Sequence, residues 1–370
     1  MHRMMIAALF FLAAGRLFAA DITDAELARR LRLPEGFEIH VFARGLSGAR
    51  FMTVGPDGMI YVSLPGSGTV VRLRADGGST ARAERVIDGL DRAHGLAFRD
   101  GKLYVAGTRK IWRVDQFRGD SAAPGRTTEI VSNLPDGGHS TRTILFGADG
   151  KLYVSIGSSC NVCKEKDPRR AAIVRYNQDG TGEEIFATGL RNSVGIAWHP
   201  VTKELWGTDN GRDWLGDDSP PEEINIIRQG KNYGWPNCYA DRVPDPEFGS
   251  EEICRKTEPP LVKIQAHSAP LGLAFYTAKQ FPEQYRGDLF VALHGSWNRS
   301  KKTGYKVIRI RLPNGKPARP EDFVTGWLSQ ENGADTVWGR PVDLVVGGDG
   351  SLYLSDDAAG LIYRISYQKK

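Results

Sequence analysis

A single pattern of apolar and polar positions recurs along the chain. Each copy holds a few apolar residues, a polar turn with Asp-Gly or an equivalent, and then a strand with an aromatic or large apolar residue. Asp-Gly between alternating apolar residues is the strongest short-range signal of a β-hairpin. The sequence therefore predicts six hairpins. They are TVGPDGMIYVS (53–63), LAFRDGKLYVAG (96–107), LFGADGKLYVSIG (145–157), IAWHPVTKELWGTD (196–209), LAFYTAKQFPEQYRGDLFVALHG (273–295) and LVVGGDGSLYLSDD (344–357).

Most hairpins are followed by a further strand with an apolar-apolar-Arg-apolar core, as in VVRLRADG, KIWRVD and AIVRYNQDG. The first aromatic markers, Tyr61, Tyr104, Tyr153 and Trp206, are spaced by 43, 49 and 53 residues, close to the ~40–50 residues of known blade repeats. Six units of about four strands each predict an all-β, six-bladed β-propeller in a single domain over residues 21–370. A two-sheet sandwich is the alternative, but sandwiches do not repeat one hairpin six times.

Two long segments interrupt the repeat, over residues 230–260 and 313–338. Insertions in repeat proteins cluster on one face, often the binding face. Ahead of the first unit, residues 24–31 predict a short helix with Thr23 as its N-cap.

Residues 1–20 predict a signal peptide: a basic start, an apolar run and small residues at Ala19 and Ala20. The run is shorter than the ~20 apolar residues that span a bilayer, so we expect an exported, periplasmic or secreted protein without stable membrane insertion. Arg3 and Arg16 leave with the leader, and the charge of +5 becomes +3. This weak surplus includes no long basic block, which disfavours binding to nucleic acid. With 41% hydrophobic and 25% charged residues, the composition is that of an ordinary globular protein.

The four cysteines, Cys160, Cys163, Cys238 and Cys254, suggest disulfides in an exported protein. Three pairings are possible, and proximity favours Cys160 with Cys163 and Cys238 with Cys254. A redox or metal motif at Cys160–Cys163 is the weaker alternative, because there is no second CxxC and no His follows Cys163 as haem attachment requires.

Polar residues recur at the start of the first strand of several units, and in a propeller such loops converge at one end of the axial channel. The segments are RAHG (92–95), GGHSTR (137–142), GLRN (189–192), AHSAP (266–270) and WGRP (338–341). Three of the seven histidines and four arginines share this phase, which scattered surface residues would not be expected to do.

His139 is the sharpest candidate among these residues. Two preceding glycines allow close backbone approach, and an imidazole suits proton abstraction near neutral pH; the alternative is a histidine that caps a turn. Arg142, Arg191 and Arg340 suit charge-assisted hydrogen bonds to carboxylates or a carbonyl. The alternative role for these three arginines is to form salt bridges with the many nearby acidic side chains.

The segment 209–223 is acidic, with Asp209, Asp213, Asp217, Asp218 and a Glu-Glu pair at its end. Its carboxylates, Asn210 and loop carbonyls supply the oxygen ligands that calcium prefers. It does not match an EF-hand loop, and a solvated acidic loop is the alternative that the pattern alone favours.

Taken together, these motifs resemble the soluble PQQ-dependent glucose/sorbosone dehydrogenase family, especially its sorbosone and pyranose dehydrogenase-like branch. The resemblance covers nearly all of the mature chain. Its matching segments are GGHSTRT (137–143), GLRN (189–192), EEIN (222–225) with NYGWP (232–236), HSAPLG (267–272), and HGSWNR (294–299) with GYKV (304–307).

The resemblance implies a six-bladed propeller that holds pyrroloquinoline quinone (PQQ) and calcium at the top of its channel and oxidises an aldose, or an aldehyde such as sorbosone. It implies that His139 takes the proton of the anomeric hydroxyl while hydride passes to the quinone, and that Arg191 stabilises the developing negative charge. The partners it implies are a small sugar and an external electron acceptor, since the chain has no haem motif. The expected cofactor-binding residues are His94, Arg142, Arg191, Asn192, Asn210, His267, His294, Arg299 and Arg340, and the expected metal ligands are Gly211, Arg212, Glu222 and Glu223.

The sequence departs from the glucose dehydrogenases of the family at two places. Gly138 precedes His139 where those enzymes have an acid, so no local group is expected to orient the imidazole. Val342 replaces one of the two arginines of the last-blade motif and leaves Arg340.

Two other function classes compete with a quinoprotein. Six-bladed propellers also include calcium-dependent lactonase-type hydrolases, but the axis of such an enzyme needs Asp, Glu and Asn around the metal instead of arginine and histidine. A non-catalytic propeller that binds a partner or glycan through its insertions would leave the converging histidines and arginines without a role.

Overall fold

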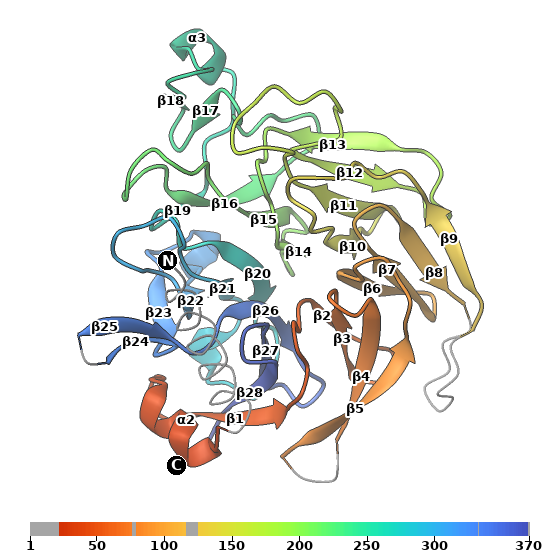
Figure 1. The fold of residues 1–370 in the computed structure, drawn as a ribbon, viewed down its shortest axis with the longest axis vertical. Helices are drawn as coiled ribbons and strands as arrows, with labels where there is room; N and C mark the ends of the chain where they lie inside the picture. The colour runs from red at the N-terminus through yellow and green to blue at the C-terminus, as the bar shows by residue number, and fades with distance from the viewer. Residues whose placement is uncertain (1–21, 76–78, 116–124, 332, 369–370) are drawn as a thin grey trace, which may run out of the picture.

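The computed structural model describes residues 22–75, 79–115, 125–331 and 333–368; the predicted signal peptide lies outside these ranges. The described residues form six four-stranded antiparallel sheets arranged as blades around a central axis (Figure 1), which confirms the predicted propeller. The first three blades are β2 (Met52–Val54), β3 (Ile60–Leu64), β4 (Thr69–Ala75) and β5 (Ala81–Ile87); β6 (Gly95–Arg99), β7 (Lys102–Ala106), β8 (Ile111–Val114) and β9 (Thr127–Val131); and β10 (Ile144–Phe146), β11 (Leu152–Ile156), β12 (Ala172–Tyr176) and β13 (Glu184–Thr188). The last three are β14 (Ile196–Trp198), β15 (Leu205–Asp209), β16 (Glu222–Ile227) and β19 (Val262–Ile264); β20 (Pro270–Phe275), β21 (Leu289–Leu293), β22 (Lys306–Ile310) and β23 (Glu321–Val324); and β26 (Pro341–Val346), β27 (Leu352–Asp356), β28 (Leu361–Tyr367) and β1 (Phe37–Ala43).

The first strands of the blades form a closed ring around the axis. β2, β6, β10, β14, β20 and β26 each contact the next one in that order, and β26 contacts β2. Side-chain hydroxyls near the ends of β15 and β27 link neighbouring blades: Thr208 donates to the carbonyl of Leu271 at 2.9 Å, and Ser355 donates to that of Arg50 at 2.6 Å. The loops that precede the first strands are therefore held at one end of the channel, as the sequence predicts.

The hairpin turns explain why a tyrosine marks three of the six repeats. In three blades the turn aspartate accepts the hydroxyl of a tyrosine four residues later and the backbone N–H two residues later. The pairs are Asp57 with Tyr61 at 2.7 Å, Asp149 with Tyr153 at 2.9 Å and Asp349 with Tyr353 at 3.1 Å. These bonds fix the turn to the strand that follows it, so the turn and the register are set together.

An N-terminal strand closes the propeller. β1 pairs antiparallel with β28 as the outermost strand of the last blade. Its first residue, Phe37, is buried and packs edge-on against four rings, those of Phe281, Tyr285, Phe323 and Tyr367, at centroid distances of 4.7 to 5.1 Å. The repeat pattern did not predict this strand, because it lies before the first hairpin. The helix ahead of it, α2 (Asp24–Arg30), has Thr23 as its N-cap, as predicted.

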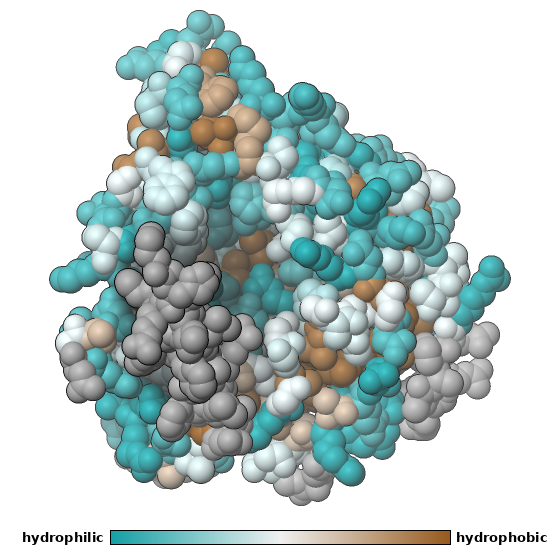
Figure 2. Space-filling model, viewed as in Figure 1, coloured by the Kyte–Doolittle hydropathy of each residue, from teal (hydrophilic) through white to brown (hydrophobic). Residues whose placement is uncertain are grey.

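The first long segment, 230–260, is an insertion, as predicted. It carries β17 (Cys238–Tyr239), β18 (Val243–Pro244) and the short helix α3 (Glu251–Cys254), and it projects from the fourth blade (Figure 1). Cys238 and Cys254 form a disulfide within it, which confirms that pairing. Figure 2 shows a depression near the centre of the face that is viewed, with hydrophilic and hydrophobic residues in its walls.

The second long segment was only partly an insertion. It contains a single 3₁₀ turn, η2 (Pro313–Gly315), and the hairpin β24 (Leu328–Glu331) and β25 (Ala334–Val337), but β23 lies between them and is the fourth strand of the fifth blade. A further 3₁₀ turn, η1 (Glu283–Tyr285), precedes β21. Within the described ranges, no helix is both long and apolar enough to cross a membrane.

Candidate functional site

Two of the predicted arginines occupy equivalent positions in different blades. A buried aspartate at the end of the second strand, Asp209, accepts the backbone N–H of Arg191 at 3.0 Å and of Asn192 at 2.7 Å. In the last blade, Asp356 accepts the backbone N–H of Arg340 at 2.8 Å. Burial raises the pKa of Asp209 to about 7 and that of Asp356 to about 6. The same backbone device thus places both arginine loops at the same end of the channel.

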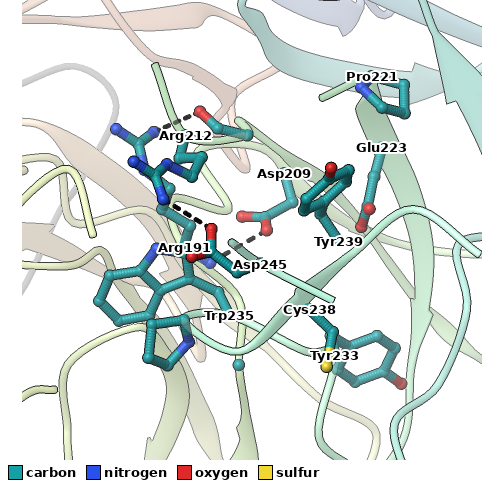
Figure 3. A pocket seen from close by; sticks show the side chains of 13 residues that line it. Arg191, Asp209, Arg212, Pro221, Glu223, Tyr233, Trp235, Cys238, Tyr239 and Asp245 are labelled. Atoms are coloured by element: carbon teal, nitrogen blue, oxygen red, sulfur yellow. Dashed lines mark hydrogen bonds and ion pairs between the residues drawn. The ribbon is translucent and has the colours of Figure 1, made fainter. Parts of the chain in front are cut away.

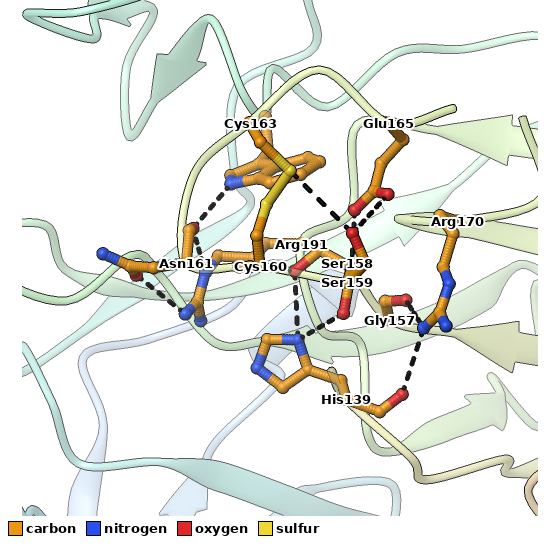
Figure 4. The surroundings of a disulfide bond; sticks show 11 residues. His139, Gly157, Ser158, Ser159, Cys160, Asn161, Cys163, Glu165, Arg170 and Arg191 are labelled. Atoms are coloured by element: carbon orange, nitrogen blue, oxygen red, sulfur yellow. Dashed lines mark hydrogen bonds between the residues drawn. A yellow bond between two sulfur atoms is a disulfide. The ribbon is translucent and has the colours of Figure 1, made fainter. Parts of the chain in front are cut away.

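His139 is held in a defined orientation by Ser158. Its Nδ1 lies 3.0 Å from the Ser158 carbonyl oxygen and 3.0 Å from the Ser158 hydroxyl (Figure 4). The hydroxyl donates its only hydrogen to Cys160, so both groups facing Nδ1 are acceptors. We therefore assign the hydrogen to Nδ1, which leaves the lone pair on Nε2. The imidazole is thus oriented by a residue just after β11, 19 positions later in the chain, instead of by a residue next to it in sequence.

The environment of His139 keeps the imidazole neutral. Burial, and then the charge of Arg191, lower its pKa to about 4. Gly157 lies against the ring: a Cβ at this position would stand 2.7 Å from Cβ of His139 and 2.6 Å from Oδ1 of Asn192. Since real Cβ atoms do not approach so closely, only glycine allows the side chains of His139 and Asn192 to lie together here.

The guanidinium of Arg191 is fully bonded within the protein. Nε donates to the carbonyl of Asn161 at 2.9 Å and Nη1 donates to the carbonyls of Asn210 at 3.1 Å and Gly211 at 2.7 Å. Nη2 donates to Oδ1 of Asn161 at 3.0 Å and to Asp213 at 3.2 Å. These five bonds use all five N–H groups of an arginine. The prediction that Arg191 donates hydrogen bonds to a ligand is therefore not met in this structure, and what it offers a ligand is its charge.

Asn161 belongs to a small loop closed by a disulfide. Cys160 and Cys163 are bonded to each other, as proximity predicted (Figure 4). Inside this loop, Asn161 also accepts the backbone N–H of Asp213 at 2.7 Å and donates to its carbonyl at 3.1 Å. Among the described residues, one group of three or more ligand atoms from His, Cys, Asp or Glu lies within 4.8 Å, and it is Cys160, Cys163 and Glu165. Because its two sulfurs are joined in a disulfide, this group does not form a thiolate metal site.

Arg142 does not reach the channel. Its side chain is fully buried, and its guanidinium donates to the carbonyls of His139 at 2.9 Å, Thr141 at 2.7 Å and Pro135. Burial and repulsion from Arg170 lower the pKa of Arg142 to about 9. The prediction that Arg142 faces a bound cofactor was wrong, because its side chain turns inward and braces the loop that carries His139.

The predicted metal segment divides into two parts. Asp213, Asp217 and Asp218 reach across to the fifth blade instead of converging on one point: Asp213 accepts from Asn298 at 2.8 Å, and Asp218 accepts from Arg299 at 2.8 Å. The loop acids thus form no shared carboxylate cage, and Asp218 stays exposed to solvent while it pairs with Arg299. They hold two loops together.

The other part of the segment is buried. Glu222 accepts the backbone N–H groups of Gly211 at 2.8 Å and Ala269 at 3.2 Å, and Glu223 accepts that of Ala240 at 2.8 Å. Burial raises the pKa of both glutamates to about 8.

A small enclosed cavity of about 20 Å³ lies in this region (Figure 3). Its lining includes Asp209, Gly211, Arg212, Glu223 and Asp245. Such a volume holds about one water molecule or one ion. The side chain of Arg212 does not serve as a metal ligand, because its guanidinium pairs with Asp245 and Glu247 at 2.7 Å each. Only its backbone carbonyl remains as a potential ligand.

The fifth and sixth blades contribute a second buried histidine. Nε2 of His294 lies 2.9 Å from Asp357, which in turn pairs with Arg50 at 2.7 Å. Arg340 donates to the carbonyls of His294 at 3.0 Å and Gly295 at 2.9 Å. Burial lowers the pKa of His294 to about 4. This half of the channel end is therefore fixed by an ion-paired network.

Two cavities open next to these groups. One of about 330 Å³ is lined by Arg50, Arg92, His94 and Asp357 among others, and one of about 550 Å³ is bordered by Gly137 and Gly138, next to His139. His94 is buried with no partner for its Nδ1. Two further predicted residues lie in loops next to strands. Asn210 donates to the carbonyl of Pro270 at 2.9 Å, and His267 contacts the carbonyl of Gly216 at 2.8 Å.

The sequence reasoning missed Ser158, Asn161, Arg50 and Asp357. Ser158 lies just after the second strand of its blade and Asp357 directly follows that of the last blade, so the repeat itself contained a signal for these two residues. Arg50 gave no such signal, because its partner Asp357 lies 307 residues later.

Comparison with known proteins identifies related chains. Residues 31–368 match the family model described as TrAA12-like. The chain is 32% identical to an uncharacterised protein of Borreliella burgdorferi, over 99% of this chain and 97% of that protein. It is 24% identical to a pyrroloquinoline quinone-dependent sugar dehydrogenase of Hypocrea jecorina, over 97% and 95%. A calcium structure of a family AA12 carbohydrate-active enzyme of Trichoderma reesei has a TM-score of 0.79 at 22% identity, over 92% of this chain and 97% of that one.

Proposed function

The chain belongs to the TrAA12-like family, and we propose that it is a PQQ-dependent dehydrogenase that oxidises an aldose sugar or a sorbosone-like aldehyde. The PQQ dependence of the Hypocrea jecorina relative, aligned over almost the whole chain, supports this assignment. The structural observation that carries it is the group formed by His139, Asn192 and Arg191. A neutral imidazole with a free Nε2, an amide and a buried cation lie together there.

The donor set at the end of the channel fits PQQ, a planar anion with three carboxylates. Arg50, Arg92 and His94 line one cavity, and Arg340 lies close by. His94 Nδ1 and Arg299 Nε are buried nitrogen atoms without partners, and buried polar atoms normally find partners. A bound carboxylate would supply acceptors here. His267, His294 and Asn210 would shape the walls, whereas Arg142 would support the site from behind.

The fourth blade fits calcium. Asp209, Glu222 and Glu223 are buried carboxylates whose pKa values are raised, which means that their charges are poorly compensated in the structure. A cation nearby would stabilise their ionised forms. We assign the ligand role to the carbonyl oxygens of Gly211 and Arg212, with Glu222 and Glu223 as carboxylates behind them.

The residues of the chain prepare the proton transfer. Bound PQQ supplies the two-electron acceptor that takes hydride from the sugar. His139 accepts the proton of the sugar hydroxyl at Nε2, because Ser158 holds the hydrogen of the ring at Nδ1. As the pKa of His139 is about 4, the base is unprotonated at neutral pH. Arg191 remains fixed by its five bonds and provides positive charge where negative charge develops.

Reconstitution of the purified protein with PQQ and calcium tests the proposal. Stoichiometric binding, followed by the absorbance spectrum, and reduction of an artificial dye that depends on an aldose are the expected results. His139→Gln should bind PQQ and lose dye reduction, whereas Val201→Ala, an exposed change on a distant turn, should bind PQQ and keep dye reduction. Absence of PQQ binding in the wild-type protein would overturn the proposal. The electron acceptor is proposed to be a separate molecule, and the enzyme is proposed to act in the periplasm or outside the cell.

A further inference from the structure

Two tryptophans form an exposed aromatic pair on the loops around the candidate site. Trp214 and Trp297 have 68% and 65% of their surface exposed. Their ring centroids lie 5.3 Å apart with an interplanar angle of 86°. An edge-to-face pair leaves ring faces open to a ligand. Large aromatic side chains exposed together in this way commonly mark a binding surface.

The pair stands next to Arg191 through one carboxylate. Asp213, which precedes Trp214, accepts from Arg191 at 3.2 Å and from Asn298 at 2.8 Å. Asn298 directly follows Trp297. Each indole is therefore one residue away from a chain of contacts that ends at Arg191, and the pair lies at the rim of the site that holds His139.

The loops that carry the pair are fixed before any ligand binds. Arg299 donates to Asp218 at 2.8 Å, and the backbone N–H of Ser300 donates to Asp217 at 3.1 Å. Trp214 has φ of +73°, a left-handed conformation that is unfavourable for a bulky residue and persists only where its surroundings impose it. The bonds of Asp213 and Asn161 on its N-terminal side impose it here. A preorganised surface loses little entropy when it binds a ligand.

We propose that Trp214 and Trp297 form a platform for the second sugar ring of an oligosaccharide whose terminal aldose lies at His139. This inference rests on the proposed function and specifies its substrate class. The negative face of an indole attracts the polarised C–H groups on the apolar face of a pyranose ring. A protein partner is disfavoured because a specific protein interface needs about 1,000 Å² or more, whereas two indoles offer space for one or two sugar rings.

Steady-state kinetics on the holoenzyme measure the effect directly. The probes are glucose and its dimers and tetramers, in one β-1,4-linked and one α-1,4-linked series. We expect kcat/KM for one series to exceed that for glucose by about tenfold, the size of one aromatic stacking contact, mainly through KM. Trp214→Ala and Trp297→Ala should bring this ratio towards one, Trp297→Tyr should keep part of it, and Val201→Ala should leave it unchanged.

A binding measurement without PQQ separates the platform from the chemistry. Methyl glycosides of the tetramers have no oxidisable end, and their titration into PQQ-free protein should change tryptophan fluorescence with saturation at millimolar concentration. The change should vanish in the double variant. Sugar oxidation without a chain-length gain or a fluorescence change would overturn the platform and leave the proposed function standing. Fluorescence binding without any oxidation would do the reverse. If the variants slowed reduction of a protein acceptor but not the use of tetramers, the surface would serve electron transfer and the proposal would be wrong.

Discussion

The clamp that Asn161 forms on Arg191 leads to a quantitative prediction. Its side chain accepts from Nη2 of Arg191 and from the backbone N–H of Asp213, and it donates to the carbonyl of Asp213. Asn161→Ala removes all three bonds but keeps the backbone carbonyl that accepts Nε. A hydrogen bond to a charged group contributes about 1.5–3 kcal/mol, and a stranded donor costs about 1–3 kcal/mol.

We expect Asn161→Ala to lower the free energy of unfolding by about 3 kcal/mol, near the lower end of that sum, because the Asn161 side chain is partly exposed to water. Asn161→Asp keeps the acceptor for Arg191 and for the N–H of Asp213, so it is the matched control and should lose about 1 kcal/mol. Urea unfolding followed by circular dichroism measures both. Affinity for PQQ should fall by about tenfold in Asn161→Ala, because Arg191 loses its fixed position.

A double-mutant cycle isolates the contact itself. Arg191→Met, Asn161→Ala and the double variant should give a coupling free energy of about 1.5–3 kcal/mol. A coupling below about 0.5 kcal/mol, within the range found for independent sites, would show that the two side chains do not depend on each other. The clamp would then have to be abandoned as the reason why Arg191 is held.

Four further outcomes follow from other features of the structure. Because the pKa of His139 is about 4, kcat/KM should stay constant down to about pH 5, and a fall centred near pH 6.5 would refute the assignment of His139 as the base. Arg191→Gln removes a positive charge and should shift this fall to higher pH, whereas Arg191→Lys keeps the charge and should not. Because this pKa is lower in the folded protein, the unfolded chain binds a proton more readily between about pH 6.5 and 4, and the free energy of unfolding should fall as pH falls through that window. His139→Gln should reduce the dependence of this free energy on pH, measured by urea unfolding. Phe37→Ala should destabilise the protein by about 3–5 kcal/mol, because it empties a site lined by four rings, three of which belong to the fifth blade. A thermal melt that matches the wild type would show that β1 does not secure closure. Replacing Cys238 and Cys254 by serine opens a crosslink with a sequence separation of 16 and should cost about 3 kcal/mol in urea unfolding, unless the insertion unfolds separately from the blades.

Much of the architecture can be predicted from the sequence because it depends on the spacing of residues close together in the chain. Alternation of apolar and polar residues with a turn aspartate defines a hairpin within a dozen residues, and repetition of that hairpin defines the blades. The shared position of Arg191 and Arg340 also follows from the repeat, and the structure places both on a buried aspartate. Both disulfides were predicted for the same reason, since each joins cysteines close in sequence.

Tertiary structure decided the features that depend on side-chain direction or on distant partners. The phase of a repeat says at which end of the channel a residue lies, but it does not say which way its side chain points. Arg142 turns inward to backbone carbonyls while His139, three residues earlier, bonds Ser158 through Nδ1. The closing strand β1 pairs with β28 more than 300 residues away in sequence, and no local pattern encodes such a pairing.

The acids of the segment 209–223 show the same division. Their composition suits a cation site although the pattern alone favours a solvated loop, and burial of Glu222 and Glu223 agrees with a cation site. Asp213 and Asp218, however, bond to residues of the fifth blade that lie some 80 residues later. The sequence by itself determined that this segment gathers negative charge at the channel end, because composition and repeat phase are local properties. Only the folded chain decided which carboxylates pair with a charged side chain and which are buried with backbone N–H groups alone as donors, because that depends on how neighbouring blades pack.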